Sequence, residues 1–161
     1  MKKAIIIGTS LSGKTTTIKH LRSITNLPIS EVDEELTMIN GGVFPLDTEY
    51  KHNILFPQVA KLILNKSEII FFTNSDYFSI EQLQEAREKG FKIVQIQVSL
   101  DVLKKRNIKR QKEGYDNLEQ YLKGMVEYQK VIKEQNLVDY IIDGEQSSEK
   151  VISDLLDLLN K

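Results

Sequence analysis

Short apolar runs alternate with longer amphipathic stretches along this chain. The runs predict strands at residues 4–7, 28–32, 68–73, 91–98 and 138–142. Apolar positions at helical spacing predict helices over residues 14–25, 80–89 and 147–159, and Gly90 ends the second of these helices. Near-continuous apolar strands separated by helices are typical of a parallel sheet covered on both faces. The pattern therefore predicts an α/β three-layer sandwich with a five-stranded parallel sheet.

The stretch between the second and third predicted strands, residues 34–66, is unusually long. We expect it to be helical in two pieces around Pro57, because proline interrupts the hydrogen bonds of a helix. No internal repeat, low-complexity tract or linker rich in proline and glycine divides the chain. Its 161 residues suit one domain. The sequence therefore predicts a single domain over residues 1–161.

The most specific motif follows the first predicted strand. Residues 8–15 match the P-loop pattern G-x-x-x-x-G-K-T, placed between an apolar strand and a helix. Its two glycines allow a tight turn whose N–H groups bind phosphate oxygens, and the following helix adds its positive N-terminal end. Lys14 would lie on the β- and γ-phosphates, and the Thr15 hydroxyl would bind Mg²⁺. A glycine-rich turn without a ligand is the alternative, which the order of strand, motif and helix disfavours.

The motif predicts ATP and Mg²⁺ as cofactors. The nucleotide-binding residues that it predicts are Gly8, Ser10, Leu11, Ser12, Gly13, Lys14, Thr15 and Thr16.

Composition narrows the class of protein further. The net charge of −1 indicates no bulk attraction to nucleic acid or to an anionic membrane. The chain has no cysteine, which excludes disulfides and thiolate metal sites. The N-terminal apolar run, residues 4–7, is too short for a signal peptide or a membrane span. We therefore expect a cytoplasmic protein with no membrane partner.

With its P-loop and alternating strands and helices, the chain resembles the small P-loop kinases of the shikimate kinase, gluconate kinase and nucleoside monophosphate kinase group. The resemblance covers nearly the whole length and implies the P-loop NTPase fold of the nucleoside monophosphate kinase-like type. It also implies an acceptor-binding segment at about residues 34–66 and a lid at about residues 100–117. The activity that it implies is transfer of the γ-phosphoryl group of ATP to a small-molecule acceptor.

The resemblance directs attention to an acidic residue after the second strand. Asp33 lies 19 residues beyond Lys14, where that group carries an acidic residue close to the acceptor. Such a carboxylate can orient the acceptor hydroxyl, take its proton or hold the metal through water. Glu31 would point to the same side of an extended strand. The alternative is that both belong to a solvated acidic helix start, where carboxylates are stabilised anyway.

Two arginines are candidates for the lid. Arg106 and Arg110 follow the fourth strand, and their i, i+4 spacing places them on one helical face. The arginine side chain binds phosphate through two N–H groups at once and stacks on a base. A solvated basic helix is the alternative. The predicted catalytic residues are therefore Lys14, Asp33, Arg106 and Arg110.

The third strand departs from the pattern of the resembling kinases. It ends in Thr73-Asn74, where a Walker B strand carries an aspartate, and Asp76 comes three residues late. We therefore assign Mg²⁺ to Thr15, with Asp33 nearby, and to phosphate and water oxygens.

Charge in the acceptor segment indicates a class of acceptor. Residues 31–50 contain six acidic side chains and no lysine or arginine before Lys51. Shikimate kinase and nucleoside monophosphate kinases use arginines there to hold an anionic acceptor. A negative field disfavours carboxylates and phosphates and suits neutral or amino-bearing hydroxyl compounds. The sequence therefore predicts a kinase for a neutral or amino-bearing acceptor.

Three other functions fit parts of the pattern. The missing strand-end carboxylate would also suit a regulatory ATP-binding module, or an ATPase without a small-molecule acceptor. A GTPase is disfavoured, because the chain lacks a D-x-x-G element and a true N-K-x-D element. A nucleic-acid end kinase would use the basic stretch 104–112, but the acidic acceptor segment opposes it.

Overall fold

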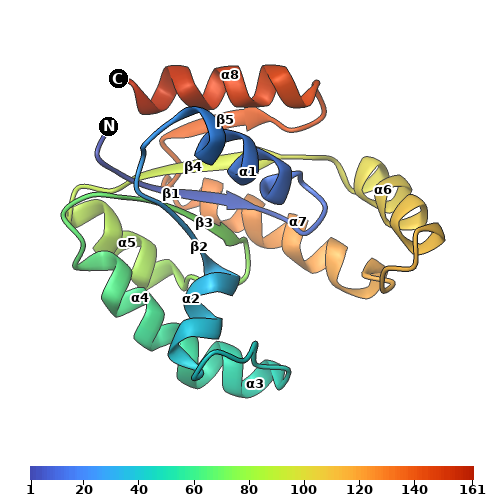
Figure 1. The fold of residues 1–161 in the computed structure, drawn as a ribbon, viewed down its shortest axis with the longest axis horizontal. Coiled ribbons are helices and arrows are strands. Elements are labelled where there is room, and N and C mark those ends of the chain that lie inside the picture. The colour runs from blue at the N-terminus through green and yellow to red at the C-terminus, as the bar shows by residue number, and fades with distance from the viewer.

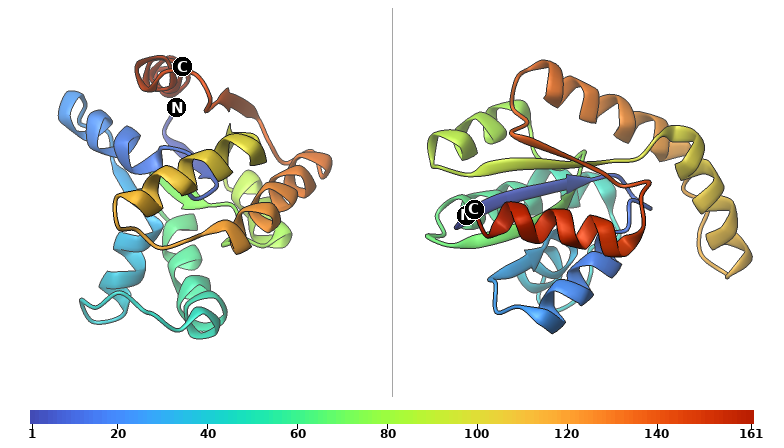
Figure 2. Two further views of the ribbon diagram at one scale, coloured as in Figure 1. Left: turned by 90° about the vertical axis from the view of Figure 1, so that its right-hand side faces the viewer. Right: turned by 90° about the horizontal axis from the view of Figure 1, so that it is seen from above.

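A computed structural model describes all residues, 1–161, and shows five parallel strands between two layers of helices (Figures 1 and 2). The strands are β1 (Lys3–Gly8), β2 (Ile29–Glu31), β3 (Ile69–Asn74), β4 (Lys92–Gln97) and β5 (Tyr140–Asp143). They lie in the order β2-β3-β1-β4-β5. The helices are α1 (Lys14–Ile24), α2 (Val32–Ile39), α3 (Thr48–Tyr50), η1 (Lys51–Leu55), α4 (Phe56–Leu64), α5 (Ile80–Glu88), α6 (Leu100–Lys112), α7 (Glu119–Glu134) and α8 (Ser148–Leu159).

The predicted fold class is confirmed, and the strands follow the apolar runs to within two residues at each end. Alternating residues of each strand face opposite layers. Along β1, Ile6 packs with α1 and α8, whereas Ile5 and Ile7 pack with α2, α4, α5 and α7. Both faces of the central strands are therefore buried, which is why the middle of β1 and most of β3 are apolar at consecutive positions.

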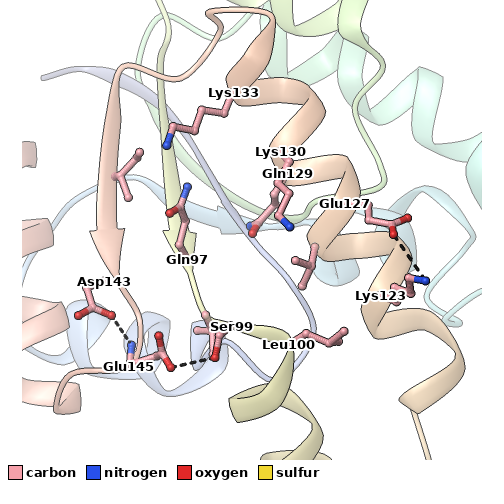
Figure 3. Close-up of a pocket in the computed structure, with 13 residues that line it drawn as sticks. Gln97, Ser99, Leu100, Lys123, Glu127, Gln129, Lys130, Lys133, Asp143 and Glu145 are labelled. Carbon is pink, nitrogen blue, oxygen red and sulfur yellow. Dashed lines mark hydrogen bonds and ion pairs between the residues drawn. The ribbon is translucent and has the colours of Figure 1, made fainter.

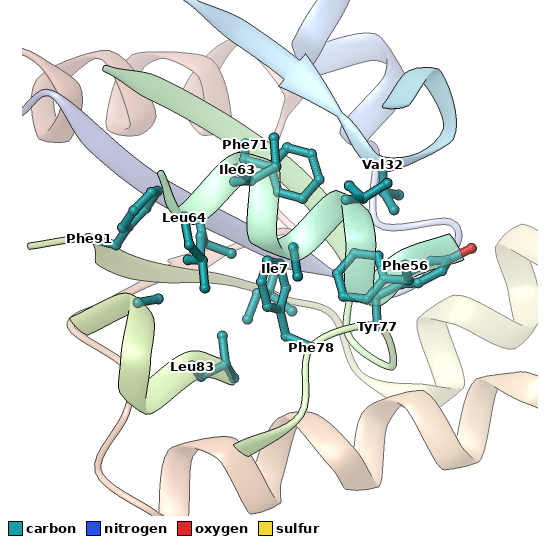
Figure 4. Packing of buried hydrophobic residues seen from close by; sticks show 14 of the residues in the cluster. Ile7, Val32, Phe56, Ile63, Leu64, Phe71, Tyr77, Phe78, Leu83 and Phe91 are labelled. Atoms are coloured by element: carbon teal, nitrogen blue, oxygen red, sulfur yellow. The ribbon is translucent and has the colours of Figure 1, made fainter. Parts of the chain in front are cut away.

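The larger core contains a group of aromatic rings beneath α4. Phe56 packs edge-on against Phe78 with ring centroids 4.9 Å apart, and Phe78 meets Phe71 of β3 in the same way at 6.1 Å. Tyr77 extends this group at its edge, and its hydroxyl points away from the core (Figure 4). The group fixes α4 and the β3–α5 loop against the sheet. It thereby positions Tyr77 and its neighbours at the carboxyl end of β3.

The prediction of two helical pieces around Pro57 is wrong in its break point. The helical pieces separate between Ile39 and Thr48, and the later piece runs through Pro57. Gly41 and Gly42 end α2, because both adopt the positive φ angles that other residues disfavour. Proline is tolerated because it lies in the first turn of α4, directly after the wider π-helical turn η1.

The predicted lid segment and the two chain termini lie on opposite sides of the molecule. The helix α6, in the predicted lid segment, projects from the body at the carboxyl end of the strands (Figure 1). The two termini meet on the opposite side, where the Met1 ammonium donates to the Leu159 carbonyl at 3.1 Å. None of the helices combines the length and apolar character that crossing a membrane requires.

Candidate functional site

The P-loop wraps around its own lysine. Lys14 Nζ donates to the carbonyls of Gly8 at 2.9 Å and Thr9 at 2.6 Å, and to Ser12 Oγ at 3.4 Å. A Cβ at Gly8 would collide with Ser12 Oγ and with the Lys14 side chain. Glycine is therefore required at position 8 for the lysine to lie inside the loop. At Gly13 the requirement is a positive φ of 91°.

The N-terminus of α1 is left free for an anion. Gly13 is its N-cap, and the structure shows no side-chain cap and no acidic residue in the first turn. By contrast, α5, α6 and α8 are capped by Ser79, Ser99 and Ser147. Unpaired N–H groups at a helix N-terminus bind phosphate favourably. The geometry of the loop therefore suits a polyphosphate.

A cavity of about 340 Å³ joins the P-loop to the carboxyl ends of β2 and β3. Six of the eight predicted nucleotide-binding residues line it, together with Glu31, Asp33, Asn74 and Arg110. The lining P-loop residues are Ser10, Leu11, Gly13, Lys14, Thr15 and Thr16. Of the other two, Ser12 lines a neighbouring cavity and Gly8 binds Lys14 through its carbonyl. Lys14, Asp33 and Arg110 thus share one cavity.

The neighbouring cavity, of about 350 Å³, lies between α6 and the β5–α8 connection. Arg106 lines it and donates to the carbonyls of Leu11 at 2.8 Å and Gly144 at 3.0 Å. Arg110 lines both cavities, and its guanidinium lies 3.8 Å from the ring centre of Tyr115. The two arginines therefore occupy different places: Arg106 connects the P-loop to β5, and Arg110 bridges the two cavities.

Gly144 closes the second cavity from the side of the sheet. A Cβ there would lie 2.6 Å from Val98 Cγ2, 2.8 Å from Ile96 Cγ2 and 3.1 Å from the Gln97 carbonyl. The backbone of the β5–α8 connection thus packs directly against β4, with its carbonyl turned toward Arg106.

Three carboxylates surround Lys14. Burial lowers the pKa of the Lys14 ammonium to about 8. The negative charges of Asp33, Asp76 and Glu31 act in the opposite direction, and their effects decrease in that order. The charge of Asp76 therefore acts on the same ammonium as that of Asp33, although Asp76 lines a different cavity, beside His52 and Tyr77. Spacing relative to β3 could not reveal this, because the turn after Asn74 decides how far Asp76 lies from Lys14.

The two carboxyl groups at the end of β2 are partly desolvated. Burial raises the pKa of Asp33, whereas Lys51 and Lys14 lower it less strongly. Burial also raises the pKa of Glu31, with the charges of Glu34 and Asp33 adding to the effect. A raised pKa makes a carboxylate a better proton acceptor. The direction of the shift is consistent with the role of proton acceptor that the sequence predicts for Asp33.

Residues of η1 and the β3–α5 loop border the site beyond Asp33. His52 stacks on Tyr77 with ring centroids 4.5 Å apart. Burial lowers the pKa of His52 and raises that of Tyr77. Lys51 acts on Asp33 and lies 5.3 Å from the ring centre of Phe44. Neither His52 nor Tyr77 is recognisable as a site residue from the sequence, because nothing local marks a stacked pair formed by residues 25 positions apart.

The cavity could bind Mg²⁺ only with help from phosphate. No group of three or more His, Cys, Asp or Glu side chains is arranged to hold a metal ion. The Thr15 hydroxyl and the Asp33 carboxylate do line the same cavity, and oxygen donors are those that Mg²⁺ prefers. The donor set therefore fits a Mg²⁺ ion that keeps water and phosphate oxygens as its other ligands.

Comparisons with known proteins identify the fold. No protein-family model and no curated protein sequence matches the chain. Among solved structures, shikimate kinase from Aquifex aeolicus is similar, with a TM-score of 0.71 and 24% identity over 98% of this chain and 96% of that chain. Shikimate kinase from Acinetobacter baumannii, in complex with shikimate, has a TM-score of 0.68 and 17% identity over 99% and 93%.

A gluconokinase from Sinorhizobium meliloti is also similar, with a TM-score of 0.62 and 18% identity over 99% of this chain and 96% of that chain. These alignments run over nearly the whole length of each protein, so the likeness includes the acceptor segment and α6 as well as the P-loop. The chain therefore has the P-loop NTPase fold that is shared by shikimate kinase and gluconokinase.

Proposed function

We propose that this protein transfers the γ-phosphoryl group of ATP to a hydroxyl of a small neutral or amino-bearing molecule. The observation that carries the proposal is the single cavity that contains both Lys14 of the P-loop and Asp33 at the end of β2. Phosphoryl transfer depends mainly on positioning and charge neutralisation, and this cavity offers both. The fold shared with shikimate kinase and gluconokinase supports the same activity class.

In the proposed reaction, Lys14 and the N-terminus of α1 bind the β- and γ-phosphates. Mg²⁺, held by Thr15 and by phosphate oxygens, would neutralise charge on the transferring group. Asp33 orients the acceptor hydroxyl, whose oxygen bonds to the γ-phosphorus as the bond to the β–γ bridging oxygen breaks. The hydroxyl proton passes to Asp33, and ADP leaves. Arg110, which lines the cavity from α6, would bind the transferring phosphate.

The structure refines the charge argument for the acceptor. Of the six acidic residues in 31–50, Glu34 binds Arg22 at 2.6 Å, Glu35 accepts from Ser30, and Asp47 caps α3. Only Glu31 and Asp33 of the six line the cavity. The number of acidic residues in the segment thus overstates the negative field at the acceptor.

Asp76 partly restores that field, and Lys51 partly opposes it. Asp76 acts on Lys14, His52 and Tyr77. Lys51 acts on Asp33 and is the only cation that the acceptor segment contributes to that carboxylate. Once Lys14 is engaged with phosphate, Glu31 and Asp33 line the cavity, Asp76 adds negative charge from the neighbouring cavity at His52 and Tyr77, and Lys51 opposes them. This balance supports an acceptor that is neutral or carries an amine.

The proposal is tested by following labelled γ-phosphate from Mg²⁺-ATP into pools of neutral, amino-bearing and anionic hydroxyl compounds. We expect labelled product from a neutral or amino-bearing pool. Lys14→Ala and Asp33→Asn should each lower its rate of formation by at least about a hundredfold, while the exposed Glu34→Gln serves as the matched control. Product from shikimate or a monophosphate alone would show that the acceptor class is wrong.

A regulatory ATP-binding module is the second candidate, and the end of β3 supports it. The strand closes on Thr73 and Asn74 beside the P-loop, with no carboxylate at its last position. Such a protein would bind ATP through the same loop without transferring phosphate. Tight ATP binding with no labelled product from any pool would favour this function over the kinase.

A further inference from the structure

A third cavity lies beside α7 and is separate from the two cavities at the P-loop. It has a volume of about 680 Å³ and opens between α7 and the carboxyl ends of β4 and β5 (Figure 3). None of its lining residues lines either cavity at the P-loop. Ligand sites in proteins commonly measure about 300–1,000 Å³. The cavity is therefore large enough for a small molecule of its own.

Two glutamines line this cavity with unused acceptors. Gln129 of α7 is 4% exposed, and its Nε2 donates to the Ile96 carbonyl at 3.3 Å. Gln97 of β4 donates through Nε2 to Gln95 Oε1 at 3.1 Å. The Oε1 atoms of Gln129 and Gln97 accept no hydrogen bond from the protein. Both oxygens are open to the cavity, so a ligand with an N–H or O–H group can donate to them in place of water.

The charged groups around the cavity differ in whether the protein itself supplies them with a hydrogen-bond or ion-pair partner. Asp143 Oδ1 accepts from the Glu145 backbone N–H at 2.8 Å, and Glu145 Oε1 accepts from Ser99 Oγ at 3.0 Å. On the opposite wall, Lys130 and Lys133 of α7 form no ion pair (Figure 3). The carboxylates thus have donors, and the two lysines have no counterion. A negatively charged ligand group would supply one.

The remaining wall of the cavity is apolar. It includes Leu100 at the start of α6, Val126 of α7 and Ile141 of β5. Ile141 is 46% exposed, on the face of β5 opposite the one on which Ile142 packs with α8. Burying such side chains against an apolar ligand body is favourable by about 25 cal/mol per Å².

We propose that this cavity binds a small organic anion that has an apolar body and at least one N–H or O–H donor. Its negative group lies at Lys130 and Lys133, its donor at Gln97 and Gln129, and its apolar body on Ile141. The site goes beyond the proposed kinase function and does not depend on it.

The position of this site brings its occupant close to the nucleotide cavity. Asp143 and Glu145 line the anion site, whereas Gly144 between them lines the cavity beside the P-loop. The Gly144 carbonyl accepts from Arg106 at 3.0 Å. One layer of backbone therefore separates the two ligands.

The probe for this site is 1-anilinonaphthalene-8-sulfonate, which combines a sulfonate, an N–H donor and fused aromatic rings. Titration of the full chain, followed by fluorescence, should show saturable binding of one probe molecule per chain. The double variant Lys130→Gln/Lys133→Gln should weaken this binding about five- to tenfold through the loss of two exposed ion pairs. Ile141→Glu should weaken it at least as much, because it places a carboxylate against the apolar body.

Two control variants separate this site from other surfaces that attract the probe. Lys104→Gln/Lys105→Gln removes the same charge from the exposed side of α6, and Leu46→Ser alters a side chain that is 89% exposed in the acceptor segment. Both should leave the affinity unchanged. Unchanged binding in the Lys130/Lys133 double variant, or loss of binding in Leu46→Ser, would overturn the proposal. Circular dichroism of each variant excludes misfolding as the cause.

Discussion

The nucleotide half and the acceptor half of the site are built in different ways. Phosphate would be bound by the backbone N–H groups and one lysine of a single continuous loop, residues 8–15. The acceptor would be bound by side chains from three separate places: the end of β2, the π-helical turn η1 and the β3–α5 loop. A backbone site is visible as a motif, whereas a site of dispersed side chains exists only after folding.

The two halves also differ in charge at the helices that begin there. The first turn of α1 carries no acidic residue, whereas that of α2 carries Asp33, Glu34 and Glu35. The positive end of α1 is therefore left for phosphate, and that of α2 is occupied by the protein's own carboxylates. In the proposed function, this difference separates the site for phosphate from the site for a neutral or amino-bearing acceptor.

The largest expected effect concerns the nucleotide half. Lys14→Met should weaken ATP binding by at least about a hundredfold, because it removes a charge-assisted contact to two phosphates. Calorimetric titration of ATP measures this loss. Lys19→Met, on the exposed side of α1, is the control and should bind ATP like the wild type. Equal affinity in Lys14→Met would show that the loop does not bind phosphate.

The next effect isolates the acceptor half. Asp33→Asn should lower kcat about a hundredfold, because it removes the proton acceptor, while the Kd for ATP stays within about twofold. Steady-state kinetics and ATP titration of the same preparation measure both quantities. Glu34→Gln, which breaks only the surface pair with Arg22, is the matched control. A parallel loss of ATP affinity in Asp33→Asn would mean that the two halves do not act separately.

The pH dependence of ATP affinity should distinguish the nucleotide half from the acceptor half without any change of acceptor. Burial lowers the pKa of Lys14 to about 8 in the free protein, and in the proposed function the charged form of Lys14 binds the phosphates of ATP. Lys14 is charged below this pH and becomes neutral above it, so ATP affinity should fall up to about tenfold per pH unit as the pH rises from about 8. Lys14→Arg should remove the slope, because arginine stays charged. A flat wild-type profile between pH 7 and 9.5 would contradict this.

The smallest expected effect is on stability. It is measured by thermal unfolding of alanine variants at two glycines. Gly144→Ala should destabilise the fold by about 1–3 kcal/mol, since its Cβ has no room beside Val98 and Ile96. Gly124→Ala, within α7, meets nothing within 4 Å and should stabilise the fold by about 0.5–1 kcal/mol. If both variants changed the free energy of unfolding in the same direction, close packing against Val98 and Ile96 would not be the reason for a glycine at position 144.

Much of the fold could be predicted from patterns that are local in the sequence. The apolar runs located all five strands, and Gly90 marked the end of α5. The acceptor segment was predicted less well, because Pro57 was taken as the break. The chain instead turns at Gly41 and Gly42, and the π-helical turn before Pro57 allows the helix to continue.

The residues of the candidate site also divide into those that a local sequence pattern reveals and those that only folding brings together. The sequence by itself determined the phosphate-binding loop, because eight consecutive residues carry its geometry and its chemistry. Only the tertiary structure decided that the charge of Asp76 acts on Lys14, that Glu34 and Glu35 turn away to other partners, and that His52 stacks on Tyr77. Electrostatic and stacking contacts depend on distance in space, and these residues become neighbours only when the strands and helices pack together.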